Sequence, residues 1–198
     1  MDFAPFVLAR LRPPPARVLE VGCGSGELAR ALSAARYDVT AIDPEAPDGE
    51  QFRRVSFEDF GETGPFDAVI ASRSLHHIPD LGAALDKVGD LLGPDGVLLL
   101  DEFAWDRMDD ATAEWYYTRR NEPVEGWRER WTEEHRDLHT YSAMRRELDE
   151  RFRERSFAWL PYCYRDEHAG IDVWEERLLI DKGAIQATGF RYVGEPLA

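Results

Sequence analysis

The chain has 198 residues, of which 43% are hydrophobic and 32% charged, and its formal net charge is -15. This length fits one domain with a sizeable core, and the negative charge opposes binding to nucleic acid or to an anionic membrane surface. No apolar run approaches the about 20 residues that a membrane-spanning helix needs, so we expect no membrane association and a cytoplasmic protein.

Strands and helices alternate along the first hundred residues. Apolar side chains at helical spacing predict a short helix over residues 3–11, which the Pro-rich segment 12–17 ends. Short apolar runs bounded by Gly, Pro or Asp then predict strands over 17–22, 38–43, 52–56, 66–71 and 97–103. Helical stretches separate several of these strands, at 27–37 and 81–92. The pattern predicts an α/β, doubly wound, mostly parallel sheet.

The chain changes character after residue 103. Residues 104–155 contain no strand-like run and are predicted to be helical, with the last of these helices at about 132–153. A strand at 156–164, a helix at 173–188 and a final strand at 190–195 follow. We interpret residues 1–198 as a single domain, made of a core at 17–103, a helical insertion at 104–165 and a C-terminal helix and strand at 166–198.

A glycine-rich loop follows the first strand. Its spacing is G-x-G-x-G, and a dinucleotide-binding loop would have its third glycine at the position of Glu27. A glutamate at this helix start would also repel a pyrophosphate. The loop therefore predicts a ligand that is not a dinucleotide.

Asp43 ends the second strand, where an acidic residue is well placed to accept hydrogen bonds from ribose hydroxyls. A nucleoside without a pyrophosphate fits both this acid and the glycine loop. The alternative is that Asp43 only caps the turn at Pro44.

Four ordered motifs carry a resemblance to a known family. They are VLEVGCGSGELARAL, the acid of VTAIDPE, FDAVIASRSLHHIPD and LLGPDGVLLLDEF, which together cover about residues 17–103. In this combination the chain resembles the class I S-adenosylmethionine-dependent methyltransferases, specifically their small-molecule type-11 group. The end segment GAIQATGFRYVG is also similar to that group.

The resemblance implies a seven-stranded Rossmann-like sheet, with the helical insertion after its fifth strand, and S-adenosylmethionine as cofactor. It also implies that the methionine portion is held by Glu20, Gly22, Cys23, Gly24 and Gly26, and the ribose by Asp43. The adenine contact falls among Phe57, Glu58 and Asp59, and this choice stays open. Because few residues follow 195, we expect residues 156–164 to supply the antiparallel strand of the sheet, before the last helix.

His76 and His77 follow the fourth strand, at the edge where open α/β sheets bind ligands. They are the candidate catalytic residues, since a histidine can accept a proton near neutral pH. The alternative is that one of them packs or hydrogen-bonds to shape the cofactor site. The segment lacks the Asn-Pro-Pro-Tyr or Asp-Pro-Pro-Tyr run expected of the amino-methyltransferases that act on adenine or glutamine amides.

We expect no metal site. His135 and His139 are four residues apart on a predicted helix, but no H-E-x-x-H pattern accompanies them. The cysteines Cys23 and Cys163 are too few for a disulfide framework or a four-thiolate zinc site.

The insertion at 104–165 is predicted to form a lid over a small organic acceptor. It leaves the sheet at the ligand-binding edge and is rich in aromatic and basic residues. The candidate acceptor contacts are Arg73, Tyr117, Arg120 and His135. Packing of these helices onto the sheet, or a dimer face, is the alternative, and a homodimer stays open.

The predicted function is methyl transfer from S-adenosylmethionine to a small organic acceptor by in-line displacement. Two alternatives remain: a non-catalytic or repurposed module that binds S-adenosylmethionine, and other chemistry with the same cofactor.

Overall fold

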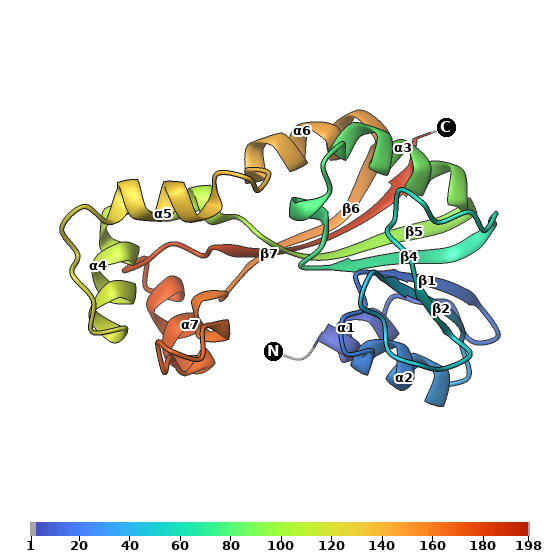
Figure 1. The fold of residues 1–198 in the computed structure, drawn as a ribbon, viewed down its shortest axis with the longest axis horizontal. Helices are drawn as coiled ribbons and strands as arrows, with labels where there is room; N and C mark the ends of the chain where they lie inside the picture. Colours follow the sequence, from blue (N-terminus) through green and yellow to red (C-terminus); the bar gives the residue numbers. More distant parts are fainter. Residues whose placement is uncertain (1–2, 198) are drawn as a thin grey trace.

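A seven-stranded sheet forms the centre of the molecule, and the computed structural model describes residues 3–197 (Figure 1). The strands are β1 (Arg17–Val21), β2 (Asp38–Asp43), β3 (Phe52–Arg54), β4 (Phe66–Ser72), β5 (Leu92–Phe103), β6 (Phe152–Leu160) and β7 (Gly189–Pro196). The α-helices are α1 (Phe3–Leu8), α2 (Glu27–Ala34), α3 (Leu81–Leu91), α4 (Asp110–Arg119), α5 (Trp127–His135), α6 (Tyr141–Arg151) and α7 (Val173–Asp181). Short 3₁₀ turns lie at η1 (Leu75–His77), η2 (Trp105–Arg107) and η3 (Cys163–Arg165).

The strands are arranged in the order β3-β2-β1-β4-β5-β7-β6. Strands β1 to β5 pair in parallel, and β7 pairs antiparallel with both β5 and β6. The predicted fold class, a mostly parallel doubly wound sheet with a helical insertion after the fifth strand, is confirmed.

The prediction that residues 156–164 form the antiparallel strand is wrong. That segment belongs to β6, which begins earlier, at Phe152, and ends before Pro161. Helix α6 carries the chain back to the amino edge of the sheet, where Phe152 faces Pro196, so β6 runs in the same direction as β1 to β5. Strand β7 starts at the opposite edge, where Gly189 faces both Phe103 and Leu160, and it therefore runs antiparallel.

The single helix predicted over about 132–153 is instead two helices, α5 and α6. The side chain of Thr140 accepts a hydrogen bond from the amide of Ala143 and so caps a new helix start. Asp106, from η2, accepts from the amide of Tyr141 at 2.7 Å. The helix predicted over 173–188 is also shorter, because Gly183 adopts a φ of 67° just after α7.

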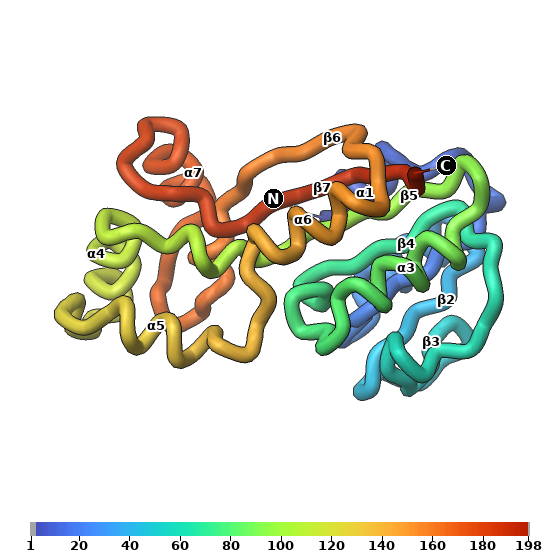
Figure 2. The backbone as a smooth tube through the Cα atoms, turned by 90° about the horizontal axis from the view of Figure 1, so that it is seen from above, coloured from blue at the N-terminus to red at the C-terminus, as the bar shows by residue number. Residues whose placement is uncertain are grey.

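Helices cover both faces of the sheet. Helices α1 and α2 lie on one face, and α3 and α6 lie on the other (Figures 1 and 2). The side chains of successive β5 residues point to opposite faces of the sheet. Leu98 and Leu100 belong to the hydrophobic cluster under α3 and α6, and Leu99 belongs to the cluster under α1 and α2. The core of the sheet is therefore buried on both sides.

Helices α4, α5 and α7 gather at one end of the molecule, beyond the carboxyl ends of the parallel strands (Figures 1 and 2). We call these three helices the distal helical group. Its aromatic core includes Tyr116, Tyr117, Trp127 and Trp131, and Phe103 at the end of β5 belongs to the same cluster. No helix within residues 3–197 has the length and apolar character that crossing a membrane would need.

Candidate functional site

The glycine loop between β1 and α2 is fixed to the neighbouring strand and open on its outer side. The amides of Gly22 and Cys23 both donate to the carbonyl oxygen of Ile42, at 2.9 and 3.0 Å. Gly24 has a φ of +49°, and a Cβ added there would meet no atom within 4 Å. Gly24 therefore presents bare backbone to an open space, as a ligand-binding loop requires.

Gly26 has a different role from Gly24. Its φ is +79°, and an added Cβ would lie 2.5 Å from the ring of Phe52. Gly26 is also the residue directly before α2, at the N-cap position, and it lines none of the three cavities around the sheet edge. Close packing against Phe52 and the left-handed backbone thus explain why position 26 is a glycine.

Asp43 holds the glycine loop from the end of β2. Its Oδ2 accepts a hydrogen bond from the amide of Gly24 at 3.0 Å, and its Oδ1 accepts from the amide of Glu45 at 2.8 Å. The side chain therefore does cap the turn at Pro44. Each carboxylate oxygen has a further lone pair, so Asp43 retains the capacity to accept from a ligand.

Glu20 is a buried acid beside this loop. It is 4% exposed, and its Oε2 has no hydrogen-bond partner among the described residues. Burial raises the pKa of Glu20 to about 7; the nearby amide of Ala29 opposes this shift, and the charge of Asp43 adds to it. An unpartnered carboxylate in such a position favours a cationic or hydrogen-donating ligand.

Two cavities flank the glycine loop. The first, of about 580 Å³, runs from Gly22, Gly24 and Asp43 past Phe57 and Glu58 to His76, His77 and Tyr162. The second, of about 660 Å³, is lined by Glu20, Cys23, Ser25, Arg73, Tyr164 and Arg165. Gly22, Gly24, Ser72 and Arg73 line both cavities, so these cavities meet at the loop.

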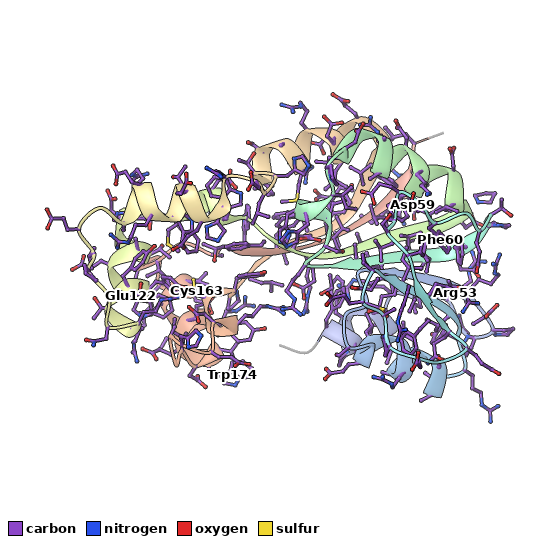
Figure 3. The ribbon with its side chains drawn as sticks, in the orientation of Figure 1. Arg53, Asp59, Phe60, Glu122, Cys163 and Trp174 are labelled. Atoms are coloured by element: carbon purple, nitrogen blue, oxygen red, sulfur yellow. The ribbon has the colours of Figure 1, made fainter. Side chains whose placement is uncertain are left out.

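Of the three candidates for the adenine contact, Phe57 and Glu58 line the first cavity and Asp59 does not. The Oδ2 of Asp59 accepts a hydrogen bond from the hydroxyl of Ser56 at 3.1 Å. Figure 3 shows Asp59 on the part of the molecule remote from the distal helical group. Phe57 and Glu58 are therefore the two candidates that the structure places at the cavity.

His76 is held by a buried glutamate. Its Nδ1 lies 2.5 Å from Oε2 of Glu102, and the side chains are 3% and 0% exposed. The other oxygen of Glu102 accepts from the amides of Ser74 and Leu75 at 3.0 and 2.8 Å. A carboxylate at Nδ1 places the proton there and leaves Nε2 as an acceptor. His76 is also one of the residues that line the first cavity.

His77 is more exposed than His76. Its ring lies 4.3 Å from the ring of His76, and it also lines the first cavity. Partial burial and, next, the neighbouring His76 lower the pKa of His77, while Glu102 opposes the shift. His77 is therefore neutral at physiological pH.

A third cavity, of about 350 Å³, lies between the sheet edge and the distal helical group. Arg73 and Tyr162 line both this cavity and the first one. Its other lining residues are Phe103, Tyr116, Arg120, Trp131, Glu134, His135, Cys163, Arg165 and Asp166. Arg73, Arg120 and His135, all predicted acceptor contacts, thus meet at one cavity.

Tyr117, the fourth predicted acceptor contact, lies elsewhere. It is 2% exposed within the aromatic core of the distal helical group and lines none of the three cavities. Arg120 is engaged within the protein: Nη1 donates to Asp166 at 2.5 Å and to the hydroxyl of Tyr116 at 3.0 Å. The structure therefore corrects Tyr117 to a packing residue.

His135 and His139 make separate contacts. Nδ1 of His135 lies 2.8 Å from the carbonyl oxygen of Trp131, and Nε2 of His139 lies 2.7 Å from that of Ile78. Burial lowers the pKa of His135. Within residues 3–197, no cluster of three or more His, Cys, Asp or Glu side chains could hold a metal ion.

Sequence reasoning missed several residues of the site. Glu102 stands beside Asp101 at the end of the apolar run VLLLDEF, and two acids in a buried strand are a detectable sign of buried partners. Tyr162 and Arg165 reach the cavities because Glu176 of α7 accepts from the amides of Tyr162, Cys163 and Tyr164. No local pattern distinguishes these residues.

Comparison with known proteins places the chain among methyltransferases. Residues 2–160 match a family model described as a methyltransferase domain. The ubiquinone biosynthesis O-methyltransferase of Xanthomonas axonopodis pv. citri (strain 306) is 40% identical over 110 residues, which cover 48% of this chain and 46% of that protein. The corresponding Xylella fastidiosa (strain M23) protein is 36% identical, with coverages of 48% and 45%. The chain spans about half the length of the curated relatives it matches.

Solved structures show the same fold. A putative S-adenosylmethionine-dependent methyltransferase from Listeria monocytogenes has a TM-score of 0.66 and 15% identity, over 98% of this chain and 96% of that one. An S-adenosylmethionine-dependent methyltransferase from Mesorhizobium loti has a TM-score of 0.64 and 14% identity, with coverages of 96% and 95%. At these identities the likeness concerns the fold alone.

Proposed function

Because the chain belongs to the methyltransferase-domain family, we propose that it transfers a methyl group from S-adenosylmethionine to a small organic acceptor by in-line displacement. The observation that carries this proposal is the third cavity, which shares Arg73 and Tyr162 with the cavity at the glycine loop. A non-catalytic binding module is favoured if residues 104–165 close the acceptor side completely. A cavity of about 350 Å³ on that side supports the enzyme.

The residues around the first two cavities fit the cofactor. Glu20 offers an unpartnered oxygen to an ammonium group, and the open face of Gly24 leaves room for a ligand beside the loop. Asp43 retains lone pairs for the ribose hydroxyls, and Phe57 and Glu58 line the cavity beyond it. We assign Gly22 and Cys23 to the loop that would hold the methionine portion.

In-line methyl transfer requires the protein to align the acceptor with the methyl group and to exclude water. When bound, S-adenosylmethionine supplies a methyl group on a cationic sulfur, which is already activated for displacement. Aromatic side chains form much of the acceptor cavity, and the rings of Phe103 and Tyr162 stack at 4.2 Å between centroids. Such walls orient a bound acceptor and displace water from it.

A proton leaves the acceptor if its reacting oxygen or nitrogen carries one. We assign this proton to Nε2 of His76, because Glu102 holds the opposite ring nitrogen. The dyad stabilises the imidazolium that forms, since the carboxylate lies next to it. His77 contributes to the wall of the cofactor cavity.

The proposal includes a role for residues 104–165 as the lid over the acceptor. It also includes a cytoplasmic setting. It includes no action on nucleic acid, which the net charge of -15 supports. A homodimer stays a prediction, and sedimentation equilibrium is its test.

Incubation of the chain with a metabolite extract and methyl-labelled S-adenosylmethionine tests the function. We expect a labelled small molecule that is absent with Gly24→Val, since a β-branched side chain is strained at a φ of +49° and fills the open space. Cofactor binding without any labelled product would favour the non-catalytic module. Consumption of the cofactor without a methylated product would favour other chemistry.

A further inference from the structure

Arg73 lies at the junction of all three cavities. It follows β4 with a φ of 55°, a conformation that is uncommon for residues other than glycine. Its amide donates to the carbonyl oxygen of Asp101 at 2.8 Å, which fixes the backbone there. Its guanidinium has no hydrogen bond, ion pair or ring contact within residues 3–197. The positive charge of Arg73 thus lies where the three cavities meet, and its N–H donors are free.

A second guanidinium lies on the same walls. Nη2 of Arg165 contacts the two oxygens of Asp101 at 3.3 and 3.1 Å. Its Nε is buried without a hydrogen-bond partner in the described part of the chain. Arg165, like Arg73, lines both the second and the third cavity. Each of these two arginines thus has at least one donor that no described residue accepts from.

The remaining charges of the third cavity do not neutralise Arg73. Arg120 and Asp166 pair with each other at 2.5 Å. Glu134 lines the cavity as an exposed side chain and has no ion pair among residues 3–197. Glu134 makes no ion pair with Arg73, so the exposed guanidinium of Arg73 remains able to meet an incoming anion.

Flat rings line the same cavity as this cation. Phe103 and Tyr162 stack with an interplanar angle of 8°, and the rings of Trp131 and His135 lie 4.1 Å apart. All four residues line the third cavity, whose volume of about 350 Å³ is at the small end of ligand-sized cavities. The walls therefore suit a small planar ring system.

Resting on the proposed function, we propose that the methyl acceptor is a small aromatic carboxylate. Arg73 and Arg165 bind its carboxylate, and its ring lies against the aromatic walls of the third cavity. A planar guanidinium matches a carboxylate through paired N–H donors. The same two arginines also line the second cavity. The carboxylate that they bind could therefore also be that of the cofactor's methionine portion, and the experiment must distinguish the two.

Calorimetry on the full chain distinguishes the two carboxylates. The probes are the three hydroxybenzoates and three aminobenzoates, each compared with its amide, in the presence of saturating S-adenosylhomocysteine. The affinity for S-adenosylhomocysteine is measured separately. We compare the parent with Arg73→Gln, and with Arg136→Gln as a control, since Arg136 is also an exposed arginine but pairs with Glu133 and lines none of the three cavities.

We expect the parent to bind at least one carboxylate about tenfold or more tightly than its amide. Arg73→Gln should abolish this preference and change the affinity for S-adenosylhomocysteine less than twofold, whereas Arg136→Gln should retain the preference. Glu134→Gln should change carboxylate binding less than twofold, because water already solvates that exposed charge.

Three results would overturn the substrate class. The first is that no carboxylate of the panel binds, and the second is that acids and amides bind equally. The third is that Arg73→Gln lowers the affinity for S-adenosylhomocysteine and leaves the affinity for the carboxylates unchanged. The proposed function fails separately, if the metabolite extract yields no methylated product while a carboxylate still binds in the manner described.

Discussion

Glu102 and His76 form a buried pair, with Oε2 of the acid 2.5 Å from Nδ1 of the imidazole. The pair joins β5 to the turn after β4, because the same carboxylate also accepts from the amides of Ser74 and Leu75. One side chain thus fixes both the backbone of the turn and the tautomer of its histidine. A single substitution can separate these roles.

Glu102→Gln is expected to lower kcat about 10²-fold, within the range that proton transfer contributes. A glutamine keeps a carbonyl oxygen for the two amides, but its NH₂ group faces Nδ1 of His76 and reverses the tautomer. Nε2 then carries the proton and cannot accept another. Steady-state kinetics as a function of pH, together with calorimetry for the cofactor, measure the effect.

A merely structural role for Glu102 predicts a different result. The variant would then melt at a lower temperature but keep its pH profile and its kcat per folded molecule. His76→Gln provides the comparison: if its kcat and pH profile match those of the parent, His76 is not the base.

Asp43→Ala is expected to weaken cofactor binding by about 1 to 3 kcal/mol, the range for hydrogen bonds to a charged group. The substitution removes the acceptor of the Gly24 and Glu45 amides as well as the proposed ribose contact. Calorimetry with S-adenosylhomocysteine gives the affinity. Asp48→Ala is the control, since Asp48 has a 95% exposed side chain. Equal affinities for Asp43→Ala and the parent would remove Asp43 from the site.

Glu20 makes the stability of the ligand-free protein depend on pH. Its folded-state pKa is about 7, above the ordinary value of 4.5, so the folded protein binds this proton more tightly than the unfolded chain does. The contribution of Glu20 to stability is therefore fully present below pH 4.5 and is lost as the pH rises through 7. The shift corresponds to a loss of up to about 3 kcal/mol.

Urea unfolding at pH 5 and pH 8 measures this dependence, with Glu20→Gln as the comparison. A glutamine is neutral at both pH values, so the free energy of unfolding of the variant should fall less between them. Parallel changes in the two proteins would show that Glu20 ionises with an ordinary pKa.

Local and non-local features differed in how well the sequence predicted them. The β1-loop-α2 segment is set by neighbours in the chain, namely the glycines and the apolar run of β1. The structure confirms the predicted order of strand, helix and strand over residues 17–43, with the two strands parallel. The direction of β6 depends on where α6 returns the chain, which packing against α3 decides; Arg151 contacts Asp86 there at 2.5 Å. No pattern within residues 156–164 contains that information.

For the acceptor cavity, too, the sequence predicted the local composition but not the contacts that depend on the fold. Composition indicated an aromatic and basic insertion, but it did not show which side of α4 each ring occupies. Tyr117 packs inward, and Arg120 pairs with Asp166. Arg165 reaches the cavities because α7 anchors the turn η3 (Cys163–Arg165), which lies far along the chain from β5.

Tyr117→Ala is therefore expected to act on stability. Removing a buried aromatic side chain costs about 3 to 5 kcal/mol of unfolding free energy. Activity per folded molecule and cofactor affinity should remain near those of the parent. Urea unfolding and kinetics corrected for the folded fraction test this, and a specific loss of acceptor affinity with unchanged stability would restore Tyr117 to the acceptor site.

Glu176 is the residue on which the position of Tyr162 and Arg165 depends most directly. Its carboxylate is fully buried and accepts from three successive amides, those of Tyr162, Cys163 and Tyr164, at 2.8, 3.0 and 2.8 Å. Glu176→Ala leaves these donors without an acceptor, at a cost of about 1 to 3 kcal/mol for each that stays buried. We expect the variant to lose at least about 3 kcal/mol of unfolding free energy in urea titrations.

Glu176→Gln separates stability from positioning. Its carbonyl oxygen still accepts from part of the turn, so a smaller loss of stability is expected and the variant should remain folded at 25 °C. Because η3 is then less firmly held, acceptor affinity should fall while the affinity for S-adenosylhomocysteine stays within a few-fold of the parent. If Glu176→Gln instead binds the acceptor as the parent does, the three amides serve only to close the turn, and Tyr162 and Arg165 reach the cavity without them.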